Sequence, residues 1–289
     1  MIVEAISGVA KAFGQSLIGI GPYVIVAAII FPILSARFSC NQSGPWWRRE
    51  GLVTDFCYWF VIPVFTRFIR IGLLVAGAAL IFGIHDQAEL SAFFEQGHGP
   101  LAVFPFWLQV IFYLFASDLL LYWVHRVFHG GTMWKYHAIH HSSEDVDWIS
   151  AARFHPVNLI LGTVMVDVAL LLAGIAPAVL GLLAPFNVIM SAFVHANLNW
   201  TLGPFRYVLA SPVFHRWHHT AAERGGSKNF AGTFPVWDLM FGTFHMPENE
   251  LPDAYGIGEP DFPKGFGGQL LYPFKDKGER VATIEKKVA

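Results

Sequence analysis

The sequence predicts an all-α integral membrane protein: a helical bundle of about four to five spans, including a helical hairpin, with a cytoplasmic histidine-rich helical cap. The 289 residues are 54% hydrophobic and only 14% charged, with a mean hydropathy of +0.47, which is much more apolar than an ordinary soluble domain. Apolar runs between residues 17 and 200 leave no room there for a separate soluble domain. Histidines clustered at helical spacings predict the cap.

We expect a single domain over residues 1–289, with membrane helices in 17–124 and 157–196 and cap segments in 125–155 and 200–289. The run from Leu17 to Ala36 is uncharged and has about the 20 residues that a bilayer core of roughly 30 Å requires. Between residues 51 and 84 we expect an interfacial segment up to about Tyr58 and then a second span.

The charges between the predicted spans indicate which way the chain crosses the membrane. The loop from His85 to Gly99 contains acidic residues but no Lys or Arg, so the positive-inside bias places it away from the cytoplasm. The next span, Leu101 to Val124, continues into basic residues, which puts the following histidines on the cytoplasmic side. Residues 157–196 then predict a helical hairpin with its turn at residues 174–177.

Three clusters of histidines have spacings that place pairs of side chains on one face of a helix. The clusters are His125 and His129; His137, His140 and His141; and His215, His218 and His219. Side chains three or four residues apart in a helix project from the same side. The second and third clusters share the pattern His-x-x-His-His. This spacing is suited to binding metal ions.

Two more histidines are expected to reach the clusters. Counting from Ile175 in the hairpin turn, His155 is 20 residues back and His195 is 20 residues forward, so both are expected at the same membrane face. For each of them alone, a packing role is the alternative. Asp118 lies within a predicted span, where an ionisable residue is a functional candidate because its desolvation is costly. A carboxylate paired with an arginine is the alternative reading of Asp118.

The number of histidines indicates the kind of metal site. Eight histidines, or ten with His155 and His195, are too many for one zinc ion and suit two metal ions. Imidazole binds Fe, Zn, Cu and Ni, so the ligand type leaves the metal open. A hydrolytic zinc site is expected to add a water-activating carboxylate, and haem needs histidines facing each other across two spans. A dinuclear iron centre that activates oxygen fits the pattern best.

The clusters and their surroundings resemble the three histidine boxes of the fatty acid hydroxylase and sterol desaturase superfamily. The boxes are His125-Arg126-Val127-Phe128-His129, His137-Ala138-Ile139-His140-His141 and His215-Arg216-Trp217-His218-His219. The flanking motifs that agree are Asp118 before Tyr122-Trp123, Arg153-Phe154-His155-Pro156, His195-Ala196-Asn197, and Trp237-Asp238. The resemblance covers roughly residues 54–273. Lys228-Asn229-Phe230-Ala231-Gly232 departs from it, because the family often has Asn, an aromatic and Gly in direct succession.

The resemblance implies a non-haem centre of two Fe ions that uses O2 to hydroxylate or desaturate a lipid, such as a fatty acyl chain or a sterol, in lipid biosynthesis. Zinc can replace iron in a purified sample. The ligands carried over by position are His125, His129, His137, His140, His141, His215, His218 and His219, with His155 and His195 added. No catalytic residue beyond the metal ligands is expected. Asp118, Asn197 and Asp238 are candidates for holding imidazole N–H groups.

The predicted reaction also constrains the partners. Each turnover needs two electrons, and the sequence has neither a Gly-x-Gly-x-x-Gly fingerprint nor a recognisable haem-binding domain, so a separate electron-donor protein is expected. Arg206, Arg216, Arg224 and Lys228 are candidates to meet an acidic donor on the cap, with a solvated basic rim as the alternative. The formal net charge of -2 argues against a nucleic-acid partner.

Three functions stay open at this point. A lipid hydroxylase is the first; a sterol or fatty acyl desaturase with the same centre is the second. The third is a metal- or lipid-binding membrane protein without turnover. The membrane is either a bacterial inner membrane or the endoplasmic reticulum. The final residues Glu285-Lys286-Lys287-Val288-Ala289 have the form of a dilysine retrieval signal of the endoplasmic reticulum, a form that carries no meaning in a bacterial protein.

Overall fold

The computed structural model describes residues 2–275, and all the regular elements in this range are helices. The all-α prediction is therefore confirmed. Four helices are long and apolar enough to cross a membrane: Phe13–Phe38, Leu52–Phe82, Phe106–Phe128 and Pro177–His195. A fifth apolar segment, Pro156–Leu172, is shorter. The chain is an integral membrane protein, while its dilysine tail lies outside the described residues.

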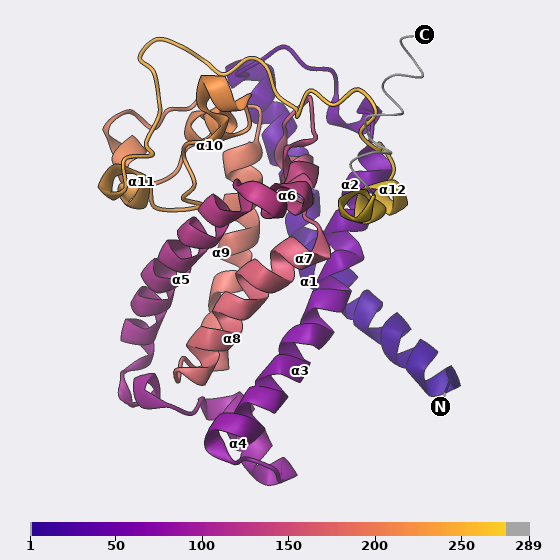
Figure 1. Cartoon of the computed structure of the whole chain (residues 1–289), viewed down its shortest axis with the longest axis vertical. Helices are drawn as coiled ribbons and strands as arrows, with labels where there is room; N and C mark the ends of the chain where they lie inside the picture. Colours follow the sequence, from indigo (N-terminus) through magenta and orange to yellow (C-terminus); the bar gives the residue numbers. More distant parts are fainter. Residues whose placement is uncertain (1, 276–289) are drawn as a thin grey trace.

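The long helices form a stem, and short helices cover one end of it. Figure 1 shows α6, α10, α11 and α12 at one end of the molecule and α4 at the opposite end. The stem consists of α1 (Ile2–Phe38), α3 (Ile62–Phe82), α5 (Phe106–Phe128), α7 (Pro156–Leu159), α8 (Met165–Leu172) and α9 (Pro177–His195). The cap contains α2 (Leu52–Phe60), α6 (Trp134–His141), α10 (Pro212–His218), α11 (Val236–Met240) and α12 (Phe266–Leu271).

Short turns of other helix types join these elements. The 3₁₀ turns are η1 (Trp46–Arg48), η2 (Pro100–Val103), η3 (Gly131–Met133), η4 (Trp148–Ala152), η6 (Gly203–Tyr207) and η8 (Tyr272–Phe274). Two turns are π-helical: η5 (Ile160–Val164), which lies between α7 and α8 inside the stem, and η7 (Ala222–Gly226) in the cap. Isolated π-helical turns are frequent at functional sites, so η5 marks a candidate functional part of the stem.

The far end of the stem is closed by loops that touch at two glycines. The loop predicted between residues 85 and 99 contains α4 (Gln87–Gln96), whose first turn is capped by the side chain of Asp86. A Cβ on Gly99 would lie 2.8 Å from the carbonyl carbon of Ala173, and a Cβ on Gly174 would lie 2.7 Å from the backbone nitrogen of Ala102. Both glycines have positive φ, so only glycine fits this crossing without strain. The hairpin turn lies where the sequence predicts it.

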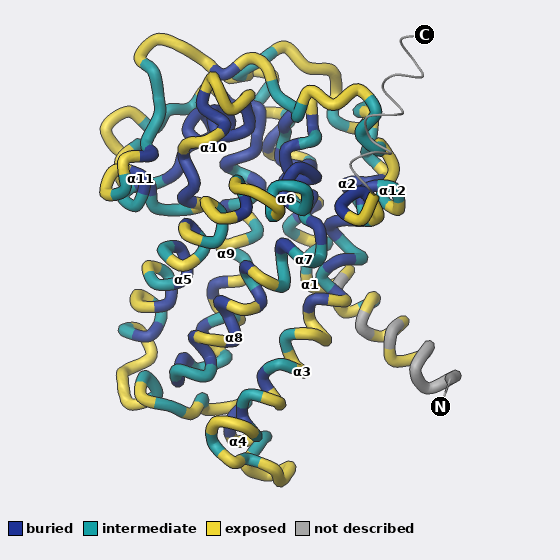
Figure 2. Tube along the Cα trace, viewed as in Figure 1, coloured by how far each residue is buried: buried dark blue, intermediate teal, exposed yellow. Residues whose placement is uncertain are grey.

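Burial differs sharply between cap and stem. In Figure 2 the cap contains long buried stretches, whereas the stem helices alternate between buried and exposed positions along their length. Trp148, Ile149 and Leu198 in the cap are fully buried. On the stem, Leu80 is 87% exposed and Ile18 is 77% exposed. Exposed aliphatic side chains of this kind are suited to contact with lipid tails. The cap is thus a packed unit standing on a lipid-facing stem.

Candidate metal centre

Four helices bring the histidines of the predicted boxes to one place. α5 ends in His125 and His129, α6 carries the second box, α10 carries the third, and α9 ends at His195. Pro212 begins α10, where its missing N–H has no cost, and the side chain of Ser211 caps the helix by accepting the backbone N–H of Phe214. Each box therefore lies on a short helix or at a helix end, pointing inwards.

The histidines form two groups whose ligand atoms lie within 4.8 Å of one another in each group. The first group is His125, His129, His137, His141 and His218. The second group is His140, His195, His215 and His219. All eight histidines of the predicted boxes are in these groups, together with His195. Each group is large enough to hold one metal ion.

The distances between ring nitrogens test whether metal ions fit. The Nε2 atoms of His125 and His137 are 3.0 Å apart, and those of His195 and His215 are 3.1 Å apart. Two nitrogens bound at about 2.1 Å to one ion lie roughly 3.0 to 3.4 Å apart, from a right angle to a tetrahedral one. The observed separations have the size that ligands of a shared ion require.

The hydrogen-bond partners of the Nδ1 atoms, which point away from the centre of each group, decide which ring nitrogen carries the proton. The Nδ1 atoms of His125 and His218 lie 2.7 Å from the backbone carbonyls of Phe230 and Lys228. The Nδ1 of His195 lies 2.7 Å from the carbonyl of Ser191. A carbonyl only accepts, so each Nδ1 donates its proton and each Nε2 presents a lone pair. Lone pairs facing one another at about 3 Å repel unless a cation lies between them.

Burial supports the same conclusion. Desolvation lowers the pKa values of His137, His140 and His141 in the second box well below the ordinary histidine value. Desolvation has the same effect on the pKa values of His215, His218 and His219 in the third box. These imidazoles are therefore neutral, which is the state that binds metals. The buried Nε2 atoms of His129 and His218 have no hydrogen-bond partner among the described residues, which leaves them available as ligands.

His155 is not part of either group. Its Nδ1 accepts the backbone N–H of Val157 at the start of α7, and its Nε2 lies 3.1 Å from the carbonyl of Leu270. Both ring nitrogens are engaged, so the ring links α7 to α12. The matched arm lengths of the hairpin place His155 at the correct height in the membrane, but its ring turns outwards. The structure thus brings nine of the ten predicted ligands together and leaves His155 apart from them.

Asp118 holds a loop rather than an imidazole. Its carboxylate accepts the backbone N–H groups of Thr233 and Phe234, each at 2.9 Å, and the indole N–H of Trp237 at 3.1 Å. Asp118 therefore fastens the segment after the third box to α5. The predicted contact between Asp118 and a histidine N–H is not observed.

Asp238 and Asn229 act on the same segment, closer to the first group. Asp238 is fully buried and accepts the backbone N–H groups of Phe230 and Ala231. Asn229 has a φ of +57° and donates its side-chain N–H groups to the carbonyls of Phe214 and His245. It lies between the two carbonyls that orient His218 and His125. Asp238 and Asn229 thus set these imidazoles through the backbone between them.

Asn197 and Arg216 join the cap to the end of α9. Asn197 exchanges hydrogen bonds with the backbone of Asn41 at 2.8 and 2.9 Å and makes no contact with an imidazole. Arg216 is 1% exposed and donates to the carbonyls of Val146 and His195. A side chain this buried has no free guanidinium for a docking protein, which corrects the prediction for Arg216. It instead fastens the end of the helix that carries His195.

Asn158 is a site residue that the sequence analysis missed. Its side-chain oxygen lies 2.7 Å from the Nδ1 of His137, so the amide orients a ring of the first group. Asn158 is three residues after His155, at the start of an apolar run. A polar residue at the second position of a predicted span is the signal that points to it.

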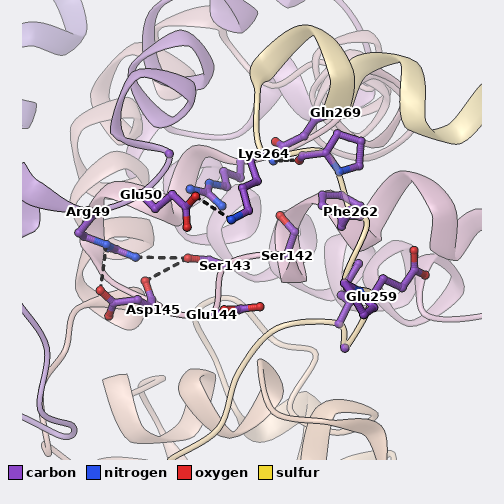
Figure 3. A pocket seen from close by; sticks show the side chains of 16 residues that line it. Arg49, Glu50, Ser142, Ser143, Glu144, Asp145, Glu259, Phe262, Lys264 and Gln269 are labelled. Atoms are coloured by element: carbon purple, nitrogen blue, oxygen red, sulfur yellow. Dashed lines mark hydrogen bonds and ion pairs between the residues drawn. The ribbon is translucent and has the colours of Figure 1, made fainter. Parts of the chain in front are cut away.

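A polar pocket of about 340 Å³ has a wall of cap residues (Figure 3). The wall includes Arg153, whose carbonyl is 3.2 Å from the Nδ1 of His140 and whose guanidinium pairs with buried Asp55. Figure 3 also shows Arg49 reaching to Ser143 and Asp145, and Lys264 paired with Glu50. These charged side chains are paired with one another. The ion pairs around the pocket therefore connect the cap segments next to the second group.

A second cavity, of about 280 Å³, opens from the histidines into the stem. Side chains of both groups line its cap end, and α5, α9 and the α7–η5–α8 segment form its sides. The sides are mainly apolar. A metal centre at this place therefore lies at the mouth of an apolar chamber at membrane depth.

The sequence is similar to a known protein family and to several of its members. Residues 110–243 match the fatty acid hydroxylase family. The chain is 31% identical over 184 residues to "Ornithine lipid hydroxylase OlsE" of Rhizobium tropici, covering 63% of this chain and 55% of the relative. It is 34% identical over 144 residues to the human "Alkylglycerol monooxygenase", covering 50% of this chain and 32% of the relative.

A rice relative named "Very-long-chain aldehyde decarbonylase GL1-11" is 27% identical over 156 residues, covering 53% of this chain and 57% of the relative. The matched region thus spans about half the length, or less, of these relatives. No solved structure matches the chain. The matched family region contains α5 from residue 110 onwards, all three histidine boxes and His195.

Proposed function

Because the chain belongs to the fatty acid hydroxylase superfamily, we propose that it is a membrane-bound non-haem di-iron oxygenase that uses O2 and external electrons to hydroxylate a lipid. One observation carries the proposal: two groups of histidines lie at the mouth of an apolar cavity inside a membrane stem. Relatives named as a lipid hydroxylase and an alkylglycerol monooxygenase support a lipid substrate.

The nine histidines are the proposed ligands of the two irons. Bound iron would supply the oxidation of an unactivated C–H bond by O2, which acid–base or nucleophilic side chains do not achieve. Among the described residues neither group includes a carboxylate. The carboxylates of Asp118 and Asp238 are occupied by backbone N–H groups. A base that activates water for hydrolysis is thus missing from both groups, which supports oxidation over hydrolysis.

The protein's own residues fix the ligands and keep the site dry. Backbone carbonyls hold the Nδ1 protons of His125, His195 and His218, so the Nε2 atoms stay directed inwards. Phe154 stacks on the ring of His140 with centroids 4.0 Å apart, and both side chains line the cavity. The apolar walls of the cavity favour an alkyl chain over water and present its carbons to the histidines.

The cap is the proposed cytoplasmic side. Near it lie Arg126 in the last turn of α5, Lys135 in α6, and Arg153 before α7. The loop at the opposite end carries acidic residues and no Lys or Arg, in keeping with the positive-inside bias. We propose that a separate electron-donor protein docks on the cap. Arg224 and Lys228 are exposed there, although Arg224 already pairs with Asp253.

The test combines metal content with isotope labelling. The purified protein is loaded with iron, its metal content is measured, and it is reduced under ¹⁸O2 in the presence of membrane lipids. The expected result is two irons per chain and a lipid that has gained a labelled hydroxyl. A new double bond without label would replace this proposal with a desaturase. If neither product forms after iron loading, the oxygenase proposal is wrong.

A further inference from the structure

The shape of the stem cavity limits the substrate to one class of lipid. Its lining on α5 extends from His125 down to Tyr113, a rise of about 18 Å, and on the α7–α8 segment from Asn158 to Asp167, a rise of about 13 Å. The cavity of about 280 Å³ is thus long relative to its width. A long, narrow cavity of this kind suits an alkyl chain, whose carbon atoms need about 4 Å to their neighbours.

The π-helical turn η5 helps to form this narrow chamber. Gly162 and Thr163 in η5 line the cavity. A Cβ on Gly162 would lie 3.5 Å from the side chain of Val124, so α5 and η5 pass each other closely at this height. The extra residue of a π-turn changes the direction in which the following side chains point. Asn158 before the turn thus faces His137, while Asp167 after it faces the deep end of the cavity.

The deep end of the cavity is closed by a polar triad. The hydroxyl of Tyr113 donates to Asp167 at 2.6 Å, and Arg70 of α3 pairs with the other oxygen of Asp167 at 2.9 Å. Tyr113 and Asp167 are each 5% exposed. Beyond them, Val166, Leu170, Ile175, Val179 and Leu183 pack against Tyr113 and fill the stem. Ionised groups are costly at membrane depth, so a triad kept there is a functional candidate.

Resting on the proposed function, we propose that Tyr113, held in place by Asp167 and Arg70, is the floor on which the tail of a single alkyl or acyl chain ends. The floor fixes how many carbons fit between the chain end and the histidines. It therefore selects both chain length and the carbon that is hydroxylated. An apolar tail does not pass the triad, because displacing its paired polar groups would cost more free energy than burying further methylene groups would gain. The proposed substrate class is a lipid with a linear alkyl or acyl chain.

The test changes the depth of the chamber in both directions. Tyr113→Ala removes the floor, and Ser117→Phe inserts a ring one helical turn higher, about 5.4 Å closer to the histidines. Phe112→Ala is the matched control, because Phe112 is adjacent but faces outwards and is 45% exposed. Each protein is incubated with a mixture of saturated n-alkanols of graded length, and the retained alkanols are identified by mass spectrometry.

We expect Tyr113→Ala to retain longer alkanols than the wild type and Ser117→Phe to retain alkanols shorter by about four methylene groups. Phe112→Ala should match the wild type. Tyr113→Phe keeps the ring and should keep the length preference, which shows whether the ring or its hydroxyl sets the limit. Unchanged preferences in both Tyr113→Ala and Ser117→Phe, or a wild type that retains no alkanol, would overturn the proposal.

The two experiments distinguish a failure of the chain-length proposal, measured by alkanol binding, from a failure of the oxygenase proposal, measured by labelled product. The wild type and the variants could bind alkanols of the expected lengths while no labelled lipid forms. In that case the oxygenase proposal is wrong, and the proposal that Tyr113 limits the chain length is supported. If labelled product forms, the position of its hydroxyl should move away from the chain end in Tyr113→Ala. If labelled product forms but neither the position of its hydroxyl nor the preferred alkanol length changes in the variants, the oxygenase proposal is supported and the role of Tyr113 is wrong.

Discussion

The two His-x-x-His-His motifs have the same spacing but divide their side chains in opposite ways. In α6, His137 and His141 belong to the first group and His140 to the second. In the motif that begins in α10, His215 and His219 belong to the second group and His218 to the first. Each motif thus contributes to both groups. The two motifs therefore contribute complementary sets of ligands: each gives two histidines to one group and one histidine to the other.

Helix geometry explains why each motif divides as it does. Positions i and i+4 differ by about 40° around the axis, whereas i+3 and i+4 differ by about 100°. The i and i+4 rings therefore share one group, and the i+3 ring points to the other. Which group receives the pair depends on how each helix is rotated in the fold. Identical local sequence patterns thus acquire different roles through packing.

The groups also differ in how firmly their rings are held. The first group has five histidines, and His125, His137 and His218 each have an outer hydrogen-bond partner. The second has four: His140 and His195 have an outer partner, whereas the buried Nδ1 atoms of His215 and His219 have none within residues 2–275. Outer partners fix ring orientation and raise metal affinity. The first group is therefore expected to be the stronger metal site, and the following experiments test that difference.

The largest effect is expected from His137→Ala. This change removes a ring whose Nε2 lies 3.0 Å from that of His125 and 3.2 Å from that of His141, so the first group loses its central ligand. Iron affinity of one site should fall by more than about 100-fold, since outer partners alone are worth 10- to 100-fold. His155→Ala is the control and should keep both irons by elemental analysis. Equal iron loss in the two variants would contradict the set of nine ligands.

The next effect is expected from Asn158→Ala, which removes the acceptor of the His137 Nδ1 proton. Iron affinity of the first group should fall about 10- to 100-fold while the second group keeps its ion. Titration of the metal-free protein with Fe²⁺ measures both affinities. Asn158→Asp retains an acceptor oxygen and should restore most of the binding. Full iron affinity in Asn158→Ala would show that His137 is oriented without this amide.

A smaller difference is expected between the two ions of the unaltered protein. A chelator should remove the ion of the second group about ten times faster, because fewer ligands and fewer outer partners hold it. Iron content is followed with time after adding the chelator. His219→Ala should leave only the slow phase, and His141→Ala should weaken the slow phase. A single phase for both ions would mean that the two groups bind equally well.

The smallest effect on metal binding is expected from Asp118→Asn, because Asp118 holds the loop far from the imidazoles. Losing a charged acceptor of three N–H groups should lower the free energy of unfolding by about 2 kcal/mol. Iron content should stay at two per chain. Asp238→Asn is the comparison, since Asp238 fixes the backbone whose carbonyl orients His125. Thermal unfolding and iron content are measured on both, and a greater iron loss in Asp118→Asn would reverse these assignments.

Several features were predictable because they depend on residues close together in the chain. Hydropathy over about 20 residues identifies the spans. A spacing of three or four residues identifies the helical faces that carry histidines. The turn of the hairpin at Gly174 follows from local glycine and proline signals. For the same reason the sequence by itself predicted an all-helical membrane protein with enough imidazoles for two metal ions.

Only the tertiary structure decided how those imidazoles are used. Whether His155 turns inwards, whether Arg216 reaches solvent, and which group receives His140 depend on contacts between segments tens of residues apart. The roles of Asn158 and Asn229 depend likewise on carbonyls and rings that only packing brings near them. Helical periodicity sets the angle between neighbouring side chains, but not the rotation of one helix against another. The sequence alone therefore determined the ligand chemistry, and packing determined its partition into two groups.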